Sequence, residues 1–391
     1  MKQSKRRIIR TCITASLLIC FSLSLSLPAR IADNFAVAAA SREPVRARHG
    51  VIASTNEVAS RVGIEVMKHG GNAVDAAIAV AFALAVTHPA AGNLGGGGFM
   101  MIRLKDGRTT AIDYREMAPA AATRNIYLDK NGNVIEGEGG SIEGYRAAGV
   151  PGTVRGMELA LKKYGSHRLT WSQLIEPARR LAANGFTVTN TLARGLRGNR
   201  EYLSKYAETK RIYLNNGKFY NEGDLFVQPD LAATFARLQQ RGPNEFYQGQ
   251  TARMIVDDLK RHGGLITLED MRGYVAKERE TLRGNYRGYE IISMPPPSSG
   301  GAVLLEMLNI LEGYDLKKMD SASSERYHFM TEAMRRAFAD RAEYMGDTDF
   351  VKVPVAGLID KKYAAQLRNS ISPDRASSSD QVKAGKPLGD E

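Results

Sequence analysis

"GGNAVDAAIAVAFALAVTHPAAGNLGGGGFM", residues 70–100, is the stretch that decides the fold of this 391-residue chain. Asn72 is a residue type that caps helices, and the apolar run over residues 73–86 predicts a helix buried on all sides. A glycine-rich loop over residues 92–98 leads from this helix into a strand. Dinucleotide sites and P-loops have the opposite order, strand, loop, helix. The loop therefore indicates close backbone packing, which a composite interpretation places beside an active site.

The flanking sequence predicts a strand and a helix upstream and a hairpin downstream. Upstream, "VIAST" at residues 51–55 predicts a buried strand, and the pattern Ser54-x-x-Glu57 predicts the start of a helix. Downstream, "KDGR" at residues 105–108 predicts a turn, and "TTAIDYRE" at residues 109–116 predicts the returning strand.

The pattern from residue 151 onward is mainly helical. Pro151 and Gly165 bracket one predicted helix. Thr170 and Gly185 bracket a second, and residues 244–262 predict a third. Many helices and few strands indicate the α+β fold class.

Two later stretches also predict helices. "MPPPSSGGA" at residues 294–302 leads from a strand into a helix, and Ser298 or Ser299 is a candidate nucleophile or anion-binding group there. A proline-stiffened turn with a serine cap is the favoured interpretation. Residues 323–344 predict an amphipathic helix. One side of that helix carries Tyr327, Met330, Met334, Phe338 and Arg341.

The net charge of +12 does not indicate a nucleic-acid partner. Six basic residues and one acid in residues 1–40 supply +5 of this charge, and the remaining basic residues are interspersed with acids. A solvated basic surface is the favoured interpretation, so no nucleic acid is expected as a partner.

The first 40 residues have the layout of a secretory signal. A basic stretch precedes an apolar run that is short for a membrane-spanning helix, and small residues follow near residues 38–40. We expect residues 1–40 to be a signal peptide and the protein to be exported, periplasmic or secreted, with an uncleaved anchor as the alternative. Cys12 and Cys20 are the only cysteines, so the mature chain would have no disulfide. The six histidines lack metal-ligand spacing, and neither a metal nor a cofactor is expected.

The last residues of the sequence, "SISPDRASSSDQVKAGKPLGDE" at 370–391, are rich in Ser, Gly, Pro and charge. This composition is typical of a linker. Residues 372–391 are therefore predicted to form a flexible linker.

One candidate binding residue lies in "TAIDYREMAP", residues 110–119. In a strand, Asp113 and Arg115 face one side and Glu116 faces the other. An arginine at a strand end can bind a carboxylate through two parallel hydrogen bonds. The alternative is a structural pair with Asp113 or Glu116, and composition alone favours it.

Several strings, in family order over about residues 45–354, resemble the gamma-glutamyltransferase (glutathione hydrolase) family. Each string is moderately specific, and together they make a strong signal. The strings are "GGNAVDAAIAV", "LAVTHPAAGNLGGGGFM", "TAIDYREMAPAAATR", "GVPGTVRGM", "GPNEFYQG", "GGLITLEDM", "YRGYEIISMPPPSSGG" and "DRAEYMGDTDFVKVP".

The resemblance implies an N-terminal-nucleophile hydrolase with a four-layer α-β-β-α sandwich. Residues 41–371 would form the large-subunit region of that fold. Members of the family are made as one precursor that cleaves itself into a large and a small subunit. The nucleophile is the Thr that begins the small subunit, activated by its own α-amine. It transfers the γ-glutamyl group of glutathione to water or to an amino-acid or peptide acceptor.

The resemblance also matches Arg115 to the arginine that binds the α-carboxylate of the glutamyl group, which changes its expected role from structural to substrate-binding. No catalytic residue is expected in this chain, because the Thr would lie beyond Glu391. The chain is expected to be inactive without a small subunit as its partner. Two alternatives stay open: a relative that acts on another amide, as cephalosporin acylases do, and an inactive binding fragment.

Overall fold

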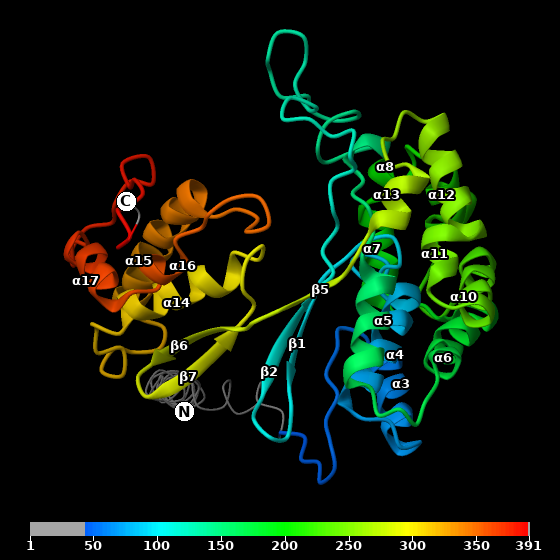
Figure 1. Cartoon of the computed structure of the whole chain (residues 1–391), viewed down its shortest axis with the longest axis horizontal. Helices are drawn as coiled ribbons and strands as arrows, with labels where there is room; N and C mark the ends of the chain where they lie inside the picture. The colour runs from blue at the N-terminus through cyan, green and yellow to red at the C-terminus, as the bar shows by residue number, and fades with distance from the viewer. Residues whose placement is uncertain (1–43, 390–391) are drawn as a thin grey trace, which may run out of the picture. The chain divides into compact units, whose positions relative to one another are not determined.

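A computed structural model of the chain describes residues 44–389. The chain divides into two units, residues 1–51 and 52–391, and every helix and strand described below belongs to the second. The predicted signal peptide, residues 1–40, lies outside the described residues. The mixture of many helices with short strands confirms the predicted α+β class (Figure 1).

The elements alternate along the chain between helical stretches and short strands (Figure 1). The strands are β1 Phe99–Arg103, β2 Thr109–Asp113, β3 Phe186–Thr187, β4 Leu225–Phe226, β5 Lys277–Arg279, β6 Leu282–Tyr286 and β7 Tyr289–Ser293. The α-helices are α3 Glu57–Lys68, α4 Ala73–Thr87, α5 Thr153–Tyr164, α6 Trp171–Asn184, α7 Asn190–Gly198, α8 Arg200–Leu203, α9 Ala207–Tyr213, α10 Pro229–Arg241, α11 Asn244–Gln248, α12 Gln250–Arg261, α13 Leu268–Gly273, α14 Gly300–Leu311, α15 Ser324–Tyr344, α16 Val355–Leu358 and α17 Lys361–Asn369. Short 3₁₀ helices occupy Tyr145–Ala147 and Asn215–Gly217.

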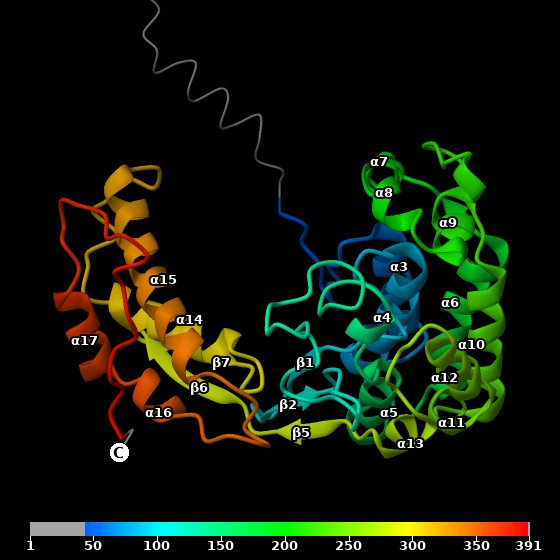
Figure 2. The ribbon, with the colours of Figure 1, turned by 90° about the horizontal axis from the view of Figure 1, so that it is seen from above.

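Helix α4 lies in the core, as its sequence predicts. Asn72 caps it: the side-chain oxygen accepts the Val74 and Asp75 N–H groups, and the Asp75 carboxylate accepts the Asn72 N–H at 2.8 Å. Helices α3, α5 and α6 pack against α4, which explains why most of its side chains are buried (Figure 2). An apolar helix without a polar face is stable only when neighbours cover it in this way.

The prediction for the segment before α3 is wrong in two respects. Residues 51–55 form no strand, because no partner strand pairs with them within the described part of the chain. The residue that caps α3 is Asn56, whose side-chain oxygen accepts the Ala59 N–H at 3.2 Å, and not Ser54. The Ser54 hydroxyl is engaged instead with the Asn56 carbonyl and with Ser60, both at 2.8 Å.

The predicted hairpin after the glycine loop is confirmed. β1 pairs with β2 and β2 pairs with β5, all antiparallel, which gives the strand order β1-β2-β5. In this register Ala111 lies opposite Arg279 and Asp113 lies opposite Lys277. Because side chains alternate along a strand, all four lie on one face of the sheet. β6 and β7 form a separate hairpin against α14.

Two of the predicted helices after residue 151 form as expected, and the third is divided. Thr170 caps α6, while Gly165 and Gly185 end α5 and α6. The predicted helix at 244–262 is interrupted at Gly249, between α11 and α12. The buried Glu245 carboxylate explains why residue 249 is a glycine, because a Cβ at this position would lie 2.0 Å from its Oε2 atom.

Helix α15 begins one residue after the predicted start at 323 and ends at the predicted residue 344, but its large apolar stripe faces outward. Tyr327 and Phe338 are 57% and 51% exposed. The side that packs into the core carries Phe329 and Ala333 instead. Within residues 44–389, the predicted amphipathic stripe is therefore largely exposed.

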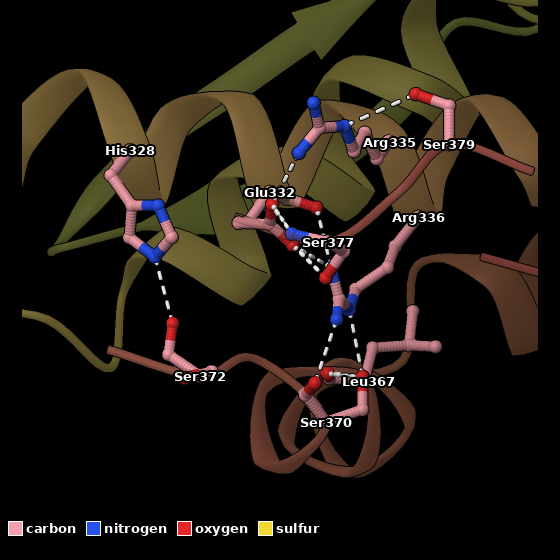
Figure 3. Close-up of polar contacts among 9 residues, drawn as sticks. All are labelled: His328, Glu332, Arg335, Arg336, Leu367, Ser370, Ser372, Ser377 and Ser379. Atoms are coloured by element: carbon pink, nitrogen blue, oxygen red, sulfur yellow. Dashed lines mark hydrogen bonds and ion pairs between the residues drawn. The ribbon is translucent and has the colours of Figure 1, made fainter. Parts of the chain in front are cut away.

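Residues 370–389, named here the C-terminal strap, contain neither helix nor strand, yet polar side chains of α15 bind them at defined positions (Figure 3). Glu332 accepts the N–H and the hydroxyl of Ser377 at 2.9 and 2.6 Å. Farther along α15, Asp340 accepts the Gly385 N–H at 2.7 Å. The predicted flexible linker, residues 372–391, therefore falls largely in a segment without regular structure whose side chains and main chain contact α15.

Candidate functional site

Arg115 follows the end of β2 by two positions, and both of its main-chain polar groups are held. Its N–H donates to Asp113 Oδ1 at 3.0 Å, and its carbonyl accepts from the Tyr274 hydroxyl at 2.7 Å. Burial raises the pKa of Tyr274 far above its usual value, so the phenol stays protonated and remains a donor. The Arg115 backbone is therefore fixed, while its side chain is exposed.

The glycine-rich loop packs against the backbone around Arg115. A Cβ at Gly97 would lie 2.4 Å from the Tyr114 carbonyl oxygen and 3.0 Å from the Arg115 carbonyl carbon. The neighbouring Gly98 exchanges two main-chain hydrogen bonds with Tyr114, at 3.2 and 3.0 Å. Only a residue without a side chain allows this approach. The prediction of close backbone packing is confirmed, and the packing lies directly beside the candidate binding residue.

The structural alternative for Arg115, a pair with Asp113 or Glu116, is not observed. Asp113 Oδ2 accepts from Arg279 Nε at 2.8 Å, so the Asp113 charge is matched by Arg279. Within residues 44–389, Arg115 has no ion pair, and its guanidinium makes one long contact, 3.5 Å, with the Pro297 carbonyl oxygen. A guanidinium fork without a protein carboxylate is suited to bind the carboxylate of a ligand.

A small cavity of about 40 Å³ opens at Arg115. Asp349 in its wall is paired with two cations: Arg279 donates to its two oxygens at 3.2 and 2.8 Å, and Lys277 donates at 2.7 Å. The hydrogen bonds from Arg279 and then Lys277 lower the pKa of Asp349 to about 2. The cavity has room for roughly one water molecule, which is less than an amino-acid ligand needs.

The serine turn before α14 contacts this cavity through Pro297. Ser299 is the N-cap residue but makes no capping bond, because its hydroxyl accepts from Arg341 Nε at 2.8 Å. The serine-cap prediction is therefore wrong for Ser299. The Ser298 hydroxyl accepts the Gly300 N–H at 3.3 Å. In the described part of the chain neither serine bonds to a histidine, so the contacts do not support a serine nucleophile.

A larger cavity, of about 660 Å³, lies between α3 and α6 and does not include Arg115. Its wall is mostly apolar, and both of its acidic residues are already paired: Glu65 with Lys68 at 2.8 Å, and Glu176 with Arg179 and Arg180 at 2.7 Å each. Among the residues that the structure describes, no three His, Cys, Asp or Glu side chains group as metal ligands. Over that same range, no helix combines the length and apolar character needed to cross a membrane.

The model of the gamma-glutamyltranspeptidase family matches residues 59–389. The chain belongs to this family. The glutathione hydrolase proenzymes of Pseudomonas sp. (strain A14) and Escherichia coli (strain K12) are 47% and 46% identical to it over 368 residues. The matches cover 94% of the chain and 63% of each proenzyme. The chain therefore spans less than two thirds of the length of these relatives.

Solved structures of the gamma-glutamyltranspeptidase family have the same fold. The enzyme of Helicobacter pylori is 49% identical with a TM-score of 0.84, over 88% of this chain and 97% of that chain. The enzyme of Pseudomonas nitroreducens is 40% identical with a TM-score of 0.81, over 87% and 99% of the two chains. These likenesses confirm the predicted fold of N-terminal-nucleophile hydrolases. The family relatives also include the acylase ACY 1 proenzyme of Pseudomonas sp. (strain SE83), 38% identical over 343 residues, which are 86% of this chain and 61% of the proenzyme.

The sequence indicates Arg115 as a candidate binding residue but gives little sign of the residues that surround it. Tyr274 and Arg279 are more than 150 positions away from the residues that they bind, Arg115 and Asp113. The alternating charges of "KERE" at residues 277–280 are the one local signal, and they are equally typical of a solvated edge strand.

Proposed function

We propose that this chain is the large-subunit portion of an exported gamma-glutamyltransferase, or glutathione hydrolase, and that Arg115 binds the α-carboxylate of the γ-glutamyl group. The observation that carries this proposal is the pattern of ion pairs around the small cavity at Arg115. Lys277 and Arg279 are bound to carboxylates of the protein, whereas Arg115 has none among residues 44–389. A substrate carboxylate would give Arg115 the two-point contact that Arg279 makes with Asp349.

The nucleophile of the proposed reaction is a Thr in the part of the precursor that this chain does not span. Its hydroxyl would attack the γ-glutamyl carbonyl while its own α-amine takes the hydroxyl proton and then donates it to the leaving amine. Water, an amino acid or a peptide would then accept the glutamyl group. The chain covers 63% of the proenzymes but 97% of the solved Helicobacter pylori chain, which supports the large-subunit assignment. By itself the chain is proposed to be inactive.

The exposed apolar stripe of α15 supports pairing with a second polypeptide, the small subunit. Met334 and Phe338, 47% and 51% exposed, border a cavity of about 580 Å³ that also includes Val382 of the C-terminal strap. Large apolar side chains gathered on one surface are typical of an interface. The names of the relatives are those of proenzymes, and a processed precursor agrees with a two-subunit enzyme.

The test is to assemble the chain with the small subunit of its own precursor and to measure the turnover of a γ-glutamyl anilide. We expect Arg115→Ala to raise KM about tenfold or more with a smaller effect on kcat, because a charged hydrogen-bonded pair contributes about 1.5–3 kcal/mol. Arg108→Ala is the matched control, because Arg108 is exposed on the turn between β1 and β2. An unchanged KM for Arg115→Ala would remove this role from Arg115.

A second candidate function is hydrolysis of another amide, and the acylase among the relatives is the observation that favours it. The proposed gamma-glutamyltransferase needs a substrate with a free α-carboxylate beside an amine, whereas the acylase does not. Turnover of a cephalosporin amide that is faster than that of the γ-glutamyl anilide, and insensitive to Arg115→Ala, would support the acylase. No turnover of either substrate by the assembled protein would leave the binding-fragment alternative.

Export is proposed from the sequence of residues 1–40 alone. N-terminal sequencing of the protein from the periplasm or the medium should give a first residue close to position 41. A protein that keeps these residues and sediments with membranes would support the uncleaved anchor instead.

A further inference from the structure

Asp113 links the main chain of Arg115 to a second arginine. Its Oδ1 atom accepts the Arg115 N–H at 3.0 Å, and its Oδ2 atom accepts from Arg279 Nε at 2.8 Å. The Asp113 and Arg279 side chains are only 9% and 15% exposed, so water competes little for this pair. Each oxygen of the Asp113 carboxylate has one partner, the Arg115 N–H or the Arg279 side chain. Because Arg279 holds Oδ2, it sets the orientation in which Oδ1 accepts the Arg115 N–H.

Arg279 is itself held from a distant part of the chain. Its two terminal nitrogens donate to the two oxygens of Asp349 at 3.2 and 2.8 Å, the geometry in which an arginine fork is most restricted. Lys277 donates to the same carboxylate at 2.7 Å. Asp349 lies between α15 and α16, so this contact ties the β2–β5 sheet to that connection.

The register of the sheet explains why these groups meet. Ala111 lies opposite Arg279 and Asp113 lies opposite Lys277, which places the three charged side chains on one face. Arg279 is thus a diagonal neighbour of Asp113, within reach of a long side chain.

We propose that Arg279 and Asp349 are positioning residues for Arg115, acting through Asp113. The proposal rests on the proposed function, in which Arg115 binds the substrate carboxylate. Tyr274 fixes the carbonyl of Arg115, and Asp113 fixes its N–H. Loss of the Arg279–Asp349 fork frees the Asp113 carboxylate to turn, which releases one of these two restraints. The Arg115 guanidinium then spends less time in the orientation that receives a carboxylate.

The test uses the assembled enzyme with the variants Arg279→Lys and Asp349→Asn. Lysine keeps the charge but cannot donate to Asp113 and to both Asp349 oxygens at once, and asparagine keeps the shape without the charge. For a γ-glutamyl anilide we expect KM to rise about three- to tenfold and kcat to change less than twofold. Arg283→Lys is the control, because Arg283 pairs with Glu290 and with Thr109 at the start of β2 but contacts neither Asp113 nor Asp349.

A second substrate separates positioning from a general loss of structure. A 4-aminobutyryl anilide has the γ-amine and the amide but no α-carboxylate, so its kcat/KM should stay the same in both variants. The preference for the γ-glutamyl anilide over this analogue should fall by the same factor as the rise in KM. An equal loss of kcat/KM for both substrates, or an unchanged preference, would overturn the proposal.

The same experiment keeps the two proposals apart. If Arg115→Ala does not change KM, the proposed role of Arg115 is refuted, and the positioning proposal, which rests on it, is refuted too. If Arg115→Ala raises KM while Arg279→Lys and Asp349→Asn leave the preference unchanged, only the positioning role fails. If all three variants lower the preference and Arg283→Lys does not, both proposals are supported.

Discussion

Glu332 is one of several α15 side chains that bind the C-terminal strap, and its replacement by Gln gives a measurable prediction (Figure 3). The Glu332 carboxylate is fully buried and accepts from Ser377, Arg335 and Arg336 at 2.5 to 2.9 Å. Burial raises its pKa, but the hydrogen bonds from Ser377 and the two arginines outweigh this effect and lower the pKa to about 2. The ordinary value is 4.5.

This difference in pKa sets the size and the pH dependence of the effect. A carboxylate whose pKa is lower in the folded state stabilises that state above the unfolded pKa, and the contribution disappears as pH falls through the folded pKa. The lower pKa of the folded state corresponds to about 3 kcal/mol of stabilisation at pH 7, and linkage reduces this to about half at pH 3. Glu332→Gln also leaves Arg336, 4% exposed, without its carboxylate, a change that adds to the loss.

The assay is hydrogen exchange resolved by peptide, because the effect is local to α15 and the strap. We expect amides in these peptides to exchange about 150-fold faster in Glu332→Gln than in the unchanged protein at pH 7, and about tenfold faster at pH 3. Glu343→Gln is the control, since Glu343 lies on the same helix but is exposed. Exchange that is equally fast in the two proteins at pH 7, or a ratio that does not fall at pH 3, would refute the reasoning.

Two further predictions concern the glycine loop and the apolar stripe. Gly97→Ala should destabilise the fold by about 1–3 kcal/mol, because the new Cβ meets the Tyr114 carbonyl oxygen at 2.4 Å, whereas Gly95→Ala should be tolerated, because a Cβ there has no neighbour within 4 Å. Thermal unfolding of both variants checks this, and an equal fall in melting temperature would contradict it. Met334→Ser with Phe338→Ser should leave the stability of the isolated chain within about 0.5 kcal/mol but reduce its co-purification with the small subunit, because both side chains are largely exposed. Co-purification equal to that of the unchanged chain would argue against the stripe as an interface.

Short-range chemistry accounts for the elements that the sequence predicted well. Asn72 and Thr170 cap α4 and α6 with bonds that span three residues, and Gly165 and Gly185 end helices at their own positions. The hairpin of β1 and β2 follows from its turn residues in the same way. Prediction from local sequence fails where two neighbouring residues could each cap the same helix. Asn56 caps α3 and Ser54 does not, because the Ser54 hydroxyl is bonded to the Asn56 carbonyl and to Ser60.

The sequence by itself determined helices α4, α5, α6 and α15, the β1–β2 hairpin, the family resemblance and the choice of Arg115 as the candidate residue. Only the tertiary structure decided that Asp113 is paired with Arg279, which leaves the Arg115 side chain available. The tertiary structure also decided the interruption at Gly249 and the outward direction of the α15 stripe. The physical reason is range: caps and turns depend on atoms a few residues apart, whereas the pairing of a charge depends on which distant segment the fold brings within about 4 Å.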